Sequence, residues 1–399
     1  MTALARCYNI ADLRAAARRR LPKGIFEFVD RGTEDEVSLR NNRAGFERIK
    51  LRQRSLVDVS KRTMQTTLFG KPMGMPLAIA PTGAAGLCWY EGELELAKAA
   101  AAAKVPFTLA TGAMTSMEKI AREAGGRLWM QLYLWRERKY SYELVQRAER
   151  AGFEALILTV DTVVSPNREY NPRNGFSLPF HPSVRAVADM LAHPRWLTGV
   201  LTRYLATTGM PRYENLPEPF RRTITSDPSQ SEITRQDTMT WEDVRRLREL
   251  WPRVLMVKGI MQPDEAVRAI ECGADAVIVS NHGGRNLDSA MATIDALPAV
   301  VEAVGDRGTV ILDSGVRRGS DIAKALALGA KAVLVGRATL YGTAVGGEAG
   351  ALRALGLLRN ELDKTMAYMA CNTVDEIGPD VLYLPRDRNR LAPMETEQV

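Results

Sequence analysis

The sequence predicts one closed (β/α)8 (TIM) barrel of the α/β class, with an N-terminal helical cap and a long insertion between its fourth and fifth strands. Short apolar runs recur eight times from about residue 76 onward. Most are followed by a stretch rich in Ala, Leu and charged residues that is long enough for a helix. This alternation indicates parallel strands with right-handed crossovers, and eight such units favour a barrel over an open sheet.

Residues 1–75 precede the first apolar run and are predicted to form the helical cap. An amphipathic helix is expected to begin near Ile10, and Leu21–Arg43 mixes a helical pattern with a glycine break and an acidic run. Because a barrel of this kind accommodates insertions within one domain, residues 1–399 are taken as a single domain.

The predicted strands are short runs in which apolar residues dominate. They are Leu77–Ala80, Phe107–Ala110, Leu128–Leu132, Ala155–Val160, Val254–Val257, Ala276–Val279, Val310–Leu312 and Ala332–Val335. Residues 93–103 and 321–328 are examples of the helices that follow them. A further helix is expected over about residues 350–370.

An interruption over residues 165–240, rich in Pro, Arg and aromatic residues, separates the fourth and fifth strands. Within it, apolar residues fall at helical spacing beside Arg195 and Arg203, namely Trp196, Leu197, Val200, Leu201, Tyr204 and Leu205. A basic amphipathic helix of this type can lie on a membrane surface. It can equally pack as a lid over the barrel mouth or against another subunit, and the pattern leaves these alternatives open.

The composition favours anionic ligands. The net charge of +7 and the pI of about 9.2 suit an anionic cofactor, substrate or membrane surface. No nucleic-acid-binding module is recognisable, and no apolar run approaches the length of a transmembrane helix. The N-terminus lacks a secretory core, and the 4 Cys are widely spaced, which favours a reducing, cytoplasmic location without a metal site.

The stretch Val277–Asp288, VIVSNHGGRNLD, is predicted to carry the chemistry. Its apolar start reads as a buried strand, and its two glycines allow a sharp turn and a close approach to a ligand. His282 is one of only 3 His and stands at the end of this strand, with Arg285 three residues later. A base beside a fixed cation suits proton abstraction from a substrate that carries a carboxylate.

The last two strands carry a predicted phosphate site. In such barrels the loops after strands seven and eight commonly bind phosphate through backbone N–H groups. Here Gly315 and Gly336 allow close approach, while Arg317 and Arg337 supply charge. No G-x-G-x-x-G follows the first strand, so a mononucleotide such as FMN is favoured over a dinucleotide.

These motifs resemble the active-site signature of the FMN-dependent α-hydroxy-acid dehydrogenases and oxidases, and the resemblance extends across nearly the whole chain. It implies an FMN site. The residues that match its flavin contacts are Pro81, Thr82, Gly83, Gln131, Thr159, Lys258, Asp313, Gly315, Arg317, Gly336 and Arg337. The family serine after strand two is replaced by Ala110, and either Thr111 or the backbone alone is expected to serve in its place.

The resemblance also assigns the chemistry. It makes His282 the general base, Asp161 the carboxylate that orients it, and Lys258 the cation beside the flavin. Arg168 and Arg285 are expected to hold the substrate carboxylate, Tyr133 to bond the carboxylate or the α-hydroxyl, and Phe28 to supply an aromatic wall in place of the family tyrosine. Asn286 stands where the family usually has Gln.

The implied reaction oxidises an (S)-2-hydroxy acid to a 2-oxo acid. Gly112 replaces a tryptophan of glycolate oxidase, which makes room for a phenyl group and favours (S)-mandelate, giving benzoylformate, over L-lactate as the runner-up. Gly83 stands where many oxygen-using relatives carry Ala, which favours a quinone or another carrier as electron acceptor over oxygen.

The resemblance to membrane-associated mandelate and lactate dehydrogenases adds expected partners. Residues 176–215 are expected to contact the inner face of the cell membrane peripherally, and a homotetramer is expected. Two other functional classes are weighed against this assignment: an FMN-dependent isomerase without net redox, and a non-catalytic binding barrel. The carboxylate-capturing Arg285 beside His282 argues against the first, and the intact base and phosphate loops argue against the second.

Overall fold

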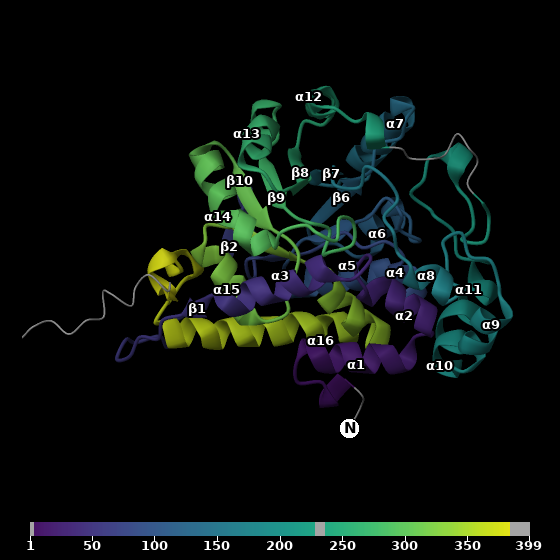
Figure 1. Cartoon of the computed structure of the whole chain (residues 1–399), viewed down its shortest axis with the longest axis horizontal. Helices are drawn as coiled ribbons and strands as arrows, with labels where there is room; N and C mark the ends of the chain where they lie inside the picture. The colour runs from purple at the N-terminus through teal and green to yellow at the C-terminus, as the bar shows by residue number, and fades with distance from the viewer. Residues whose placement is uncertain (1–3, 228–235, 384–399) are drawn as a thin grey trace, which may run out of the picture.

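The computed structural model describes residues 4–227 and 236–383. Eight parallel strands close a barrel in the order β10-β11-β4-β5-β6-β7-β8-β9 (Figure 1). They are β4 (Leu77–Ile79), β5 (Phe107–Leu109), β6 (Leu128–Leu132), β7 (Ala155–Thr159), β8 (Val254–Ile260), β9 (Ala276–Val279), β10 (Thr309–Leu312) and β11 (Ala332–Val335). All eight predicted strands are confirmed. The largest difference is at β8, which continues to Ile260.

Side chains fill the barrel interior, so the sheet encloses a packed core. On β4, Ala78 packs with the inner cluster, whereas Leu77 and Ile79 belong to the cluster between strands and helices. This alternation follows from the two-residue period of a strand. A hairpin of β2 (Thr66–Leu68) and β3 (Lys71–Met73) adds Leu68 and Met73 to the inner cluster.

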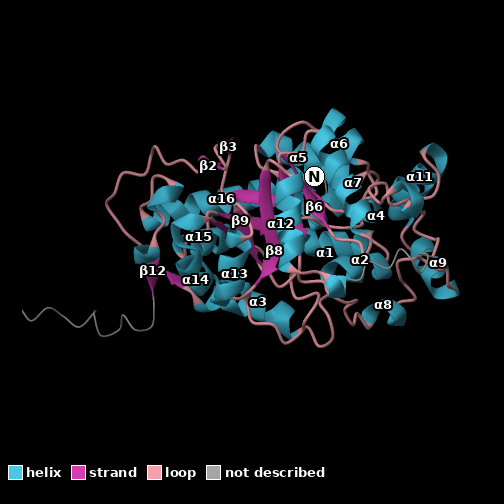
Figure 2. Ribbon diagram, turned by 90° about the horizontal axis from the view of Figure 1, so that it is seen from above, coloured by secondary structure: helices cyan, strands magenta, loops and turns pink. Residues whose placement is uncertain are grey.

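A helix follows each barrel strand on the outside, as Figure 2 shows from above. These helices are α5 (Gly92–Ala103), α6 (Met117–Glu123), α7 (Arg138–Arg150), α12 (Trp241–Leu250), α13 (Pro263–Glu271), α14 (Thr293–Val304), α15 (Gly319–Ala327) and α16 (Arg337–Met369). Shorter elements accompany them: α4 (Ala85–Cys88), η6 (Gly305–Arg307), η7 (Val374–Glu376) and η8 (Pro379–Val381). The polar tail beyond residue 383 lies outside the described residues.

The N-terminal cap is helical, as predicted, and its first long helix begins at Ile10. Its elements are η1 (Leu4–Arg6), α1 (Ile10–Arg20), α2 (Lys23–Asp30), α3 (Val37–Arg48) and β1 (Lys50–Leu51), which pairs with β12 (Leu382–Tyr383). Asp30 on α2 accepts two hydrogen bonds of 2.6 Å from Arg14 on α1 and one of 2.6 Å from Tyr341 on α16. This buried carboxylate fixes α1 and α2 against α16.

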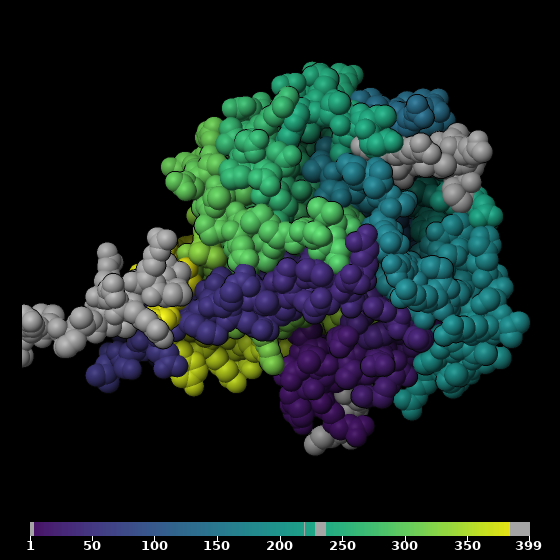
Figure 3. Space-filling view, in the orientation of Figure 1, coloured from purple at the N-terminus to yellow at the C-terminus, as the bar shows by residue number. Residues whose placement is uncertain are grey.

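The insertion forms a lobe beside the cap, drawn in teal at the edge of Figure 3. It contains α8 (Tyr170–Arg173), α9 (Val184–Leu191), α10 (Pro194–Trp196), the π-helical η2 (Leu197–Leu201), α11 (Thr202–Thr207), η3 (Glu218–Phe220) and η5 (Gln236–Thr238). The apolar stripe, for which a lid, a subunit contact and a membrane face are the open alternatives, faces inward in part: Trp196, Val200 and Tyr204 are buried, whereas Leu205 is 53% exposed. The Trp196 indole donates to the carbonyl of Leu87 at 2.6 Å. Further exposed apolar residues lie on α9, where Val184 is 90% exposed.

The helix α16 has a break that two glycines make possible. Its backbone leaves the helical conformation at Gly346 and Gly347, so the parts before and after the break cross each other. A Cβ added at Gly350 would lie 1.9 Å from the carbonyl oxygen of Gly342. No side-chain rotation relieves a clash with backbone, so this crossing requires glycine.

We therefore expect Gly350→Ala to lower the free energy of unfolding by about 1–3 kcal/mol or more. Gly356→Ala is the matched control on the same helix, because a Cβ there meets no atom within 4 Å. It should raise stability by up to about 1 kcal/mol through helix propensity. Chemical denaturation of both variants measures the difference, and equal effects would refute the proposed crossing.

Candidate active site

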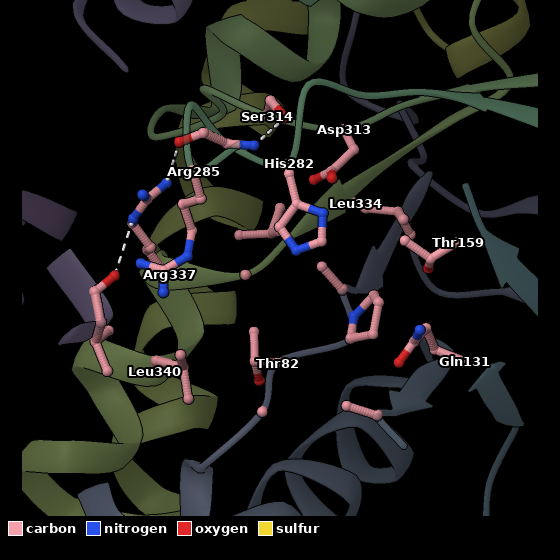
Figure 4. A pocket seen from close by; sticks show the side chains of 18 of the residues that line it. Thr82, Gln131, Thr159, His282, Arg285, Asp313, Ser314, Leu334, Arg337 and Leu340 are labelled. Atoms are coloured by element: carbon pink, nitrogen blue, oxygen red, sulfur yellow. Dashed lines mark hydrogen bonds between the residues drawn. The ribbon is translucent and has the colours of Figure 1, made fainter. Parts of the chain in front are cut away.

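The residues singled out at the strand ends converge on one pocket at the carboxyl end of the barrel. Figure 4 shows His282 between Gln131 and Thr159 on one side and Arg285 and Arg337 on the other. Of the predicted site residues, those that line this pocket are Phe28, Pro81, Thr82, Gly83, Gly112, Gln131, Tyr133, Thr159, Arg168, Lys258, His282, Arg285, Asp313, Gly315, Arg317, Gly336 and Arg337. Asp161 and Thr111 stand directly behind this lining, where each bonds to one of its members.

His282 and Asp161 form a hydrogen-bonded pair between the ends of β9 and β7. The His282 Nδ1 lies 2.9 Å from Asp161 Oδ1. Because a carboxylate only accepts, Nδ1 carries the proton and Nε2 is left as the basic nitrogen. His282 has a φ of 57°, a left-handed conformation uncommon for a residue other than Gly. The Asn286 amide donates to the Asp161 carbonyl at 2.7 Å, so it holds the β7 loop in place.

The surroundings of this pair favour a neutral imidazole and an ionised carboxylate. Burial disfavours the cation and lowers the pKa of His282, an effect that Asp161 opposes and Lys258 reinforces. Burial by itself would raise the pKa of Asp161, but its interactions with His282 and Lys258 lower it overall. At neutral pH the pair is therefore ready to accept a proton at Nε2.

Lys258 is held by a buried hydrogen-bond network whose central member is the Ser280 hydroxyl. The Lys258 ammonium donates to Ser280 Oγ at 2.9 Å and lies 3.1 Å from Asp313 Oδ2. The backbone N–H of His282 also donates to Ser280 Oγ, at 3.1 Å, so the single hydroxyl proton goes to Asp313 at 2.8 Å. Both lone pairs and the proton of Ser280 are thus used. Burial opposes the charge on Lys258, but Asp313 and Asp161 raise its pKa.

The β-bulge at Gly259 sets the direction of Lys258. The pairing of β8 with β9 shifts register between Lys258 and Ile260. Gly259 has a φ of +107°, and a Cβ added there would lie 2.5 Å from the Cβ of Asp161. Bulges often re-aim side chains next to active sites, and this one brings Lys258 and Asp161 to the same pocket.

Three half-buried arginines, Arg168, Arg285 and Arg337, form a positively charged wall of the pocket. Burial lowers the pKa of Arg285 and of Arg337 to about 10, with further lowering by Arg168 and Arg285 respectively. Their N–H groups donate to carbonyls at the carboxyl end of α2, Arg285 to Phe28 at 2.7 Å and Arg337 to Val29 at 3.0 Å. Cations are stabilised by the free carbonyls of a helix end. Because a pKa of about 10 leaves both guanidinium groups charged at neutral pH, this wall favours an anionic ligand.

The opposite side of the pocket fits a flavin. Gln131 Nε2 and Thr159 Oγ1 are buried without a hydrogen-bond partner, and both residues line the pocket. Buried polar atoms rarely stay unpaired, so each indicates a ligand that completes it. Thr111 positions Gln131 from behind: its N–H donates to Gln131 Oε1 at 3.1 Å and its hydroxyl to the Gln131 carbonyl at 2.7 Å.

The predicted phosphate loops lie at the far end of the pocket. Asp321 in the first turn of α15 accepts from the backbone N–H groups of Arg317 and Arg318, both at 2.9 Å. Arg43 of the cap donates to Asp321 at 2.6 Å and to the Gly315 carbonyl. Gly315 has a φ of +86°, and an added Cβ would lie 2.8 Å from the carbonyl oxygen of Asn42. The cap therefore fixes this loop.

Ser280 and Arg43 have no role in the sequence prediction. Ser280 stands two residues before His282, and that proximity was an available signal. Arg43 lies far from the loop in sequence, and only the packing of α3 on the barrel brings it there.

Comparison with known proteins gives consistent matches. The profile of the FMN-dependent dehydrogenase family matches residues 17–384. The chain is 40% identical over 375 residues to (S)-mandelate dehydrogenase of Pseudomonas putida, covering 94% of this chain and 93% of the relative. It is 41% identical over 389 residues to L-lactate oxidase of a Nostoc strain, covering 96% and 100%. The crystal structure of the monotopic membrane protein (S)-mandelate dehydrogenase superposes with a TM-score of 0.88 at 40% identity, covering 95% and 99%.

Ser280→Ala should loosen Lys258 without emptying the pocket. A hydrogen bond to a charged group contributes about 1.5–3 kcal/mol, so we expect the flavin midpoint potential to fall by tens of millivolts while FMN stays bound. Ser314→Ala is the control, since Ser314 lines the same pocket but its hydroxyl accepts from the Gly283 N–H, at 2.9 Å, and does not contact Lys258. Equal potentials in the Ser280 variant and the unaltered protein would contradict this network.

Proposed function

The chain belongs to the FMN-dependent dehydrogenase family, and on that premise we propose that it oxidises (S)-mandelate to benzoylformate. The family match and the named relatives support FMN-dependent oxidation of a 2-hydroxy acid. The choice of mandelate is supported above all by Gly112, which lines the pocket and beside which an added Cβ meets nothing within 4 Å. That open space has room for a phenyl group.

The pocket side chains can perform the proton chemistry of this reaction. FMN, when bound, accepts the two electrons that the substrate loses. His282 Nε2 takes one proton, either from the α-carbon or from the hydroxyl, and Asp161 stabilises the imidazolium that forms. Lys258 would place a fixed positive charge beside the flavin ring and so stabilise its reduced form. Gln131 and Thr159 would hold the flavin ring, and the Gly315–Arg317 loop would hold the phosphate.

The substrate is held by the charged wall. Arg168 and Arg285 both lie near the Phe28 ring, their guanidinium carbons 6.0 and 5.3 Å from its centroid. Arg168 Nε is buried without a partner, which leaves it available to a carboxylate. Burial raises the pKa of Tyr133, so its hydroxyl stays a donor at neutral pH. A carboxylate bound by these groups places the α-carbon beside His282.

The proposed acceptor is a quinone or another carrier at a membrane surface. The preference for a carrier over oxygen as electron acceptor rests on Gly83, and this residue lines the pocket.

The face of α9 supports the membrane contact, because it exposes Val184, Val187 and Leu191 beside Arg185. This combination is typical of segments that lie on anionic bilayers. Within residues 4–227 and 236–383, no helix combines the length and apolarity needed to cross a bilayer. The homotetramer stays a prediction that light scattering can test.

The decisive experiment is anaerobic stopped flow of the bound flavin with (S)-mandelate, L-lactate and glycolate offered separately. We expect mandelate to bleach the flavin fastest. Gly112→Trp should lower the mandelate rate at least about 10-fold while glycolate is spared, since one side chain in a pocket changes discrimination by about 1–3 kcal/mol. Faster bleaching by lactate would replace mandelate with the runner-up, and none with any acid would favour the isomerase class.

The rate of flavin reduction should fall at low pH, and this acid limb of the pH profile should reflect protonation of His282. The neutral ring is the active form, so the rate is retained above the His282 pKa and lost below it; the lowered pKa puts this loss below the ordinary value of about 6.5. Asp161→Asn removes the charge that raises this pKa, so the limb should move to still lower pH and the plateau should fall about 10²-fold or more.

Asp288→Asn is the matched control for that variant. It also removes a buried carboxylate from this end of the barrel, but Asp288 accepts from the backbone N–H groups of Asp35 and Ser38, at 3.1 and 3.2 Å. The acid limb of the pH profile of Asp288→Asn should lie at the same pH as that of the unaltered protein. A limb that is unmoved in Asp161→Asn would exclude the pair as the base.

A further inference from the structure

The insertion contains a second cavity that the chemistry above does not use. It measures about 290 Å³ and lies among α9, α10, η2 and the residues on either side of the cis peptide bond Leu178–Pro179. Its lining is apolar apart from Thr225: Ile25, Leu87, Phe176, Phe180, Pro182, Val187, Met190, Leu191, Trp196, Leu197, Leu201, Met210 and Ile224. The Trp196 N–H is already bonded to the Leu87 carbonyl at 2.6 Å, so it offers no donor to the cavity.

Such a cavity selects hydrocarbon over water. An ordered water needs two to four polar partners, whereas an apolar cavity of about 150 Å³ in another protein stays dry and binds benzene. The cavity here is about twice that size, so by the same ratio it has room for roughly ten to twelve carbons. A single alkyl chain therefore fits its size and its chemistry.

The cavity opens onto the exposed face of α9. Val187 and Leu191 line it, yet they are 43% and 64% exposed, so they form its mouth. Val184, one turn earlier on the same helix, is 90% exposed and does not line the cavity. This is the face that the proposed membrane contact would bring against a bilayer, where alkyl chains are abundant.

The charges on the segments that line the cavity indicate the head group. The two helices α9 and α10 carry exposed Arg185 and Arg195, and α9 also carries Asp189. A second carboxylate, Asp227, is paired with His181 at 3.1 Å. A phosphate pairs with such cations, whereas a neutral quinone ring has no charge to pair.

We propose that this cavity binds one acyl chain of an anionic phospholipid, whose phosphate lies at the arginines around α9. The proposal rests on the membrane association proposed above for the source of the lipid. The inner end of the cavity is close to the catalytic pocket: the Phe176 ring packs on Phe28 with 5.6 Å between centroids, and Phe28 lines that pocket. A bound chain thereby supports one wall of the active site.

The test is calorimetric titration of the FMN-loaded protein with monoalkyl phosphates of eight to sixteen carbons, below their micellar concentrations. Affinity should rise up to about four-fold per added methylene, from about 0.8 kcal/mol each, and stop rising near ten to twelve carbons. Val187→Trp should weaken dodecyl phosphate at least about 10-fold. Val184→Trp is the matched control and should stay within about two-fold. Met190→Ala, which enlarges the cavity, should move the plateau to longer chains.

Other outcomes overturn the proposal. Equal losses in the two tryptophan variants would place the chain outside the cavity, and inorganic phosphate binding as tightly as dodecyl phosphate would leave no role for a chain. Decyl-quinone binding as tightly as dodecyl phosphate would assign the cavity to a quinone tail. Flotation with anionic vesicles tests the membrane association separately, because the alkyl phosphate titration needs no bilayer.

Discussion

The burial of positive charge at the mouth of the barrel is the constraint on which the rest of the structure depends. Lys258, which is buried, and the half-buried Arg168, Arg285 and Arg337 are brought together in one pocket, and charge removed from water is costly unless it is paired. The protein meets this cost in two ways. Asp313 and Ser280 hold the lysine, and the carbonyls at the end of α2 hold two of the arginines.

This arrangement explains why the cap belongs to the active site. The carboxyl end of α2 is placed where Arg285 and Arg337 need acceptors, and Asp30 in turn anchors α2 to α1 and α16. On the next cap helix, Arg43 closes the predicted phosphate loop through Asp321. Since these bonds use only part of each guanidinium, the wall keeps donors for anionic ligands. Charged donors that stay unused in a cleft indicate a ligand site, so the cap helps to form this site as well as stabilising the barrel.

The insertion and the cap meet at Phe28 and Phe176, so the catalytic pocket and the peripheral lobe share a wall. Trp196 and Tyr204 secure the lobe to the loops after β4, the indole through the Leu87 carbonyl and the phenol by accepting from the Glu91 N–H at 2.9 Å. The lobe is therefore a packed part of the barrel mouth that still exposes one apolar helix face. Packed aromatic rings, Phe180 on Phe176 and Phe176 on Phe28, stand between the cavity beside α9 and the catalytic pocket.

The sequence by itself determined the barrel, its eight strands and the side chains at their ends, because strand period, helix length and turn chemistry are local properties. It also brought His282, Lys258 and the glycine loops into one prediction, since parallel strands place their carboxyl ends together. Only the tertiary structure decided that Ser280 links Lys258 to Asp313, that Arg43 reaches the β10 loop, and that Trp196 and Tyr204 point inward. Those outcomes depend on contacts between segments far apart in the chain, and a helical stripe has the same spacing whether it faces a core or a membrane.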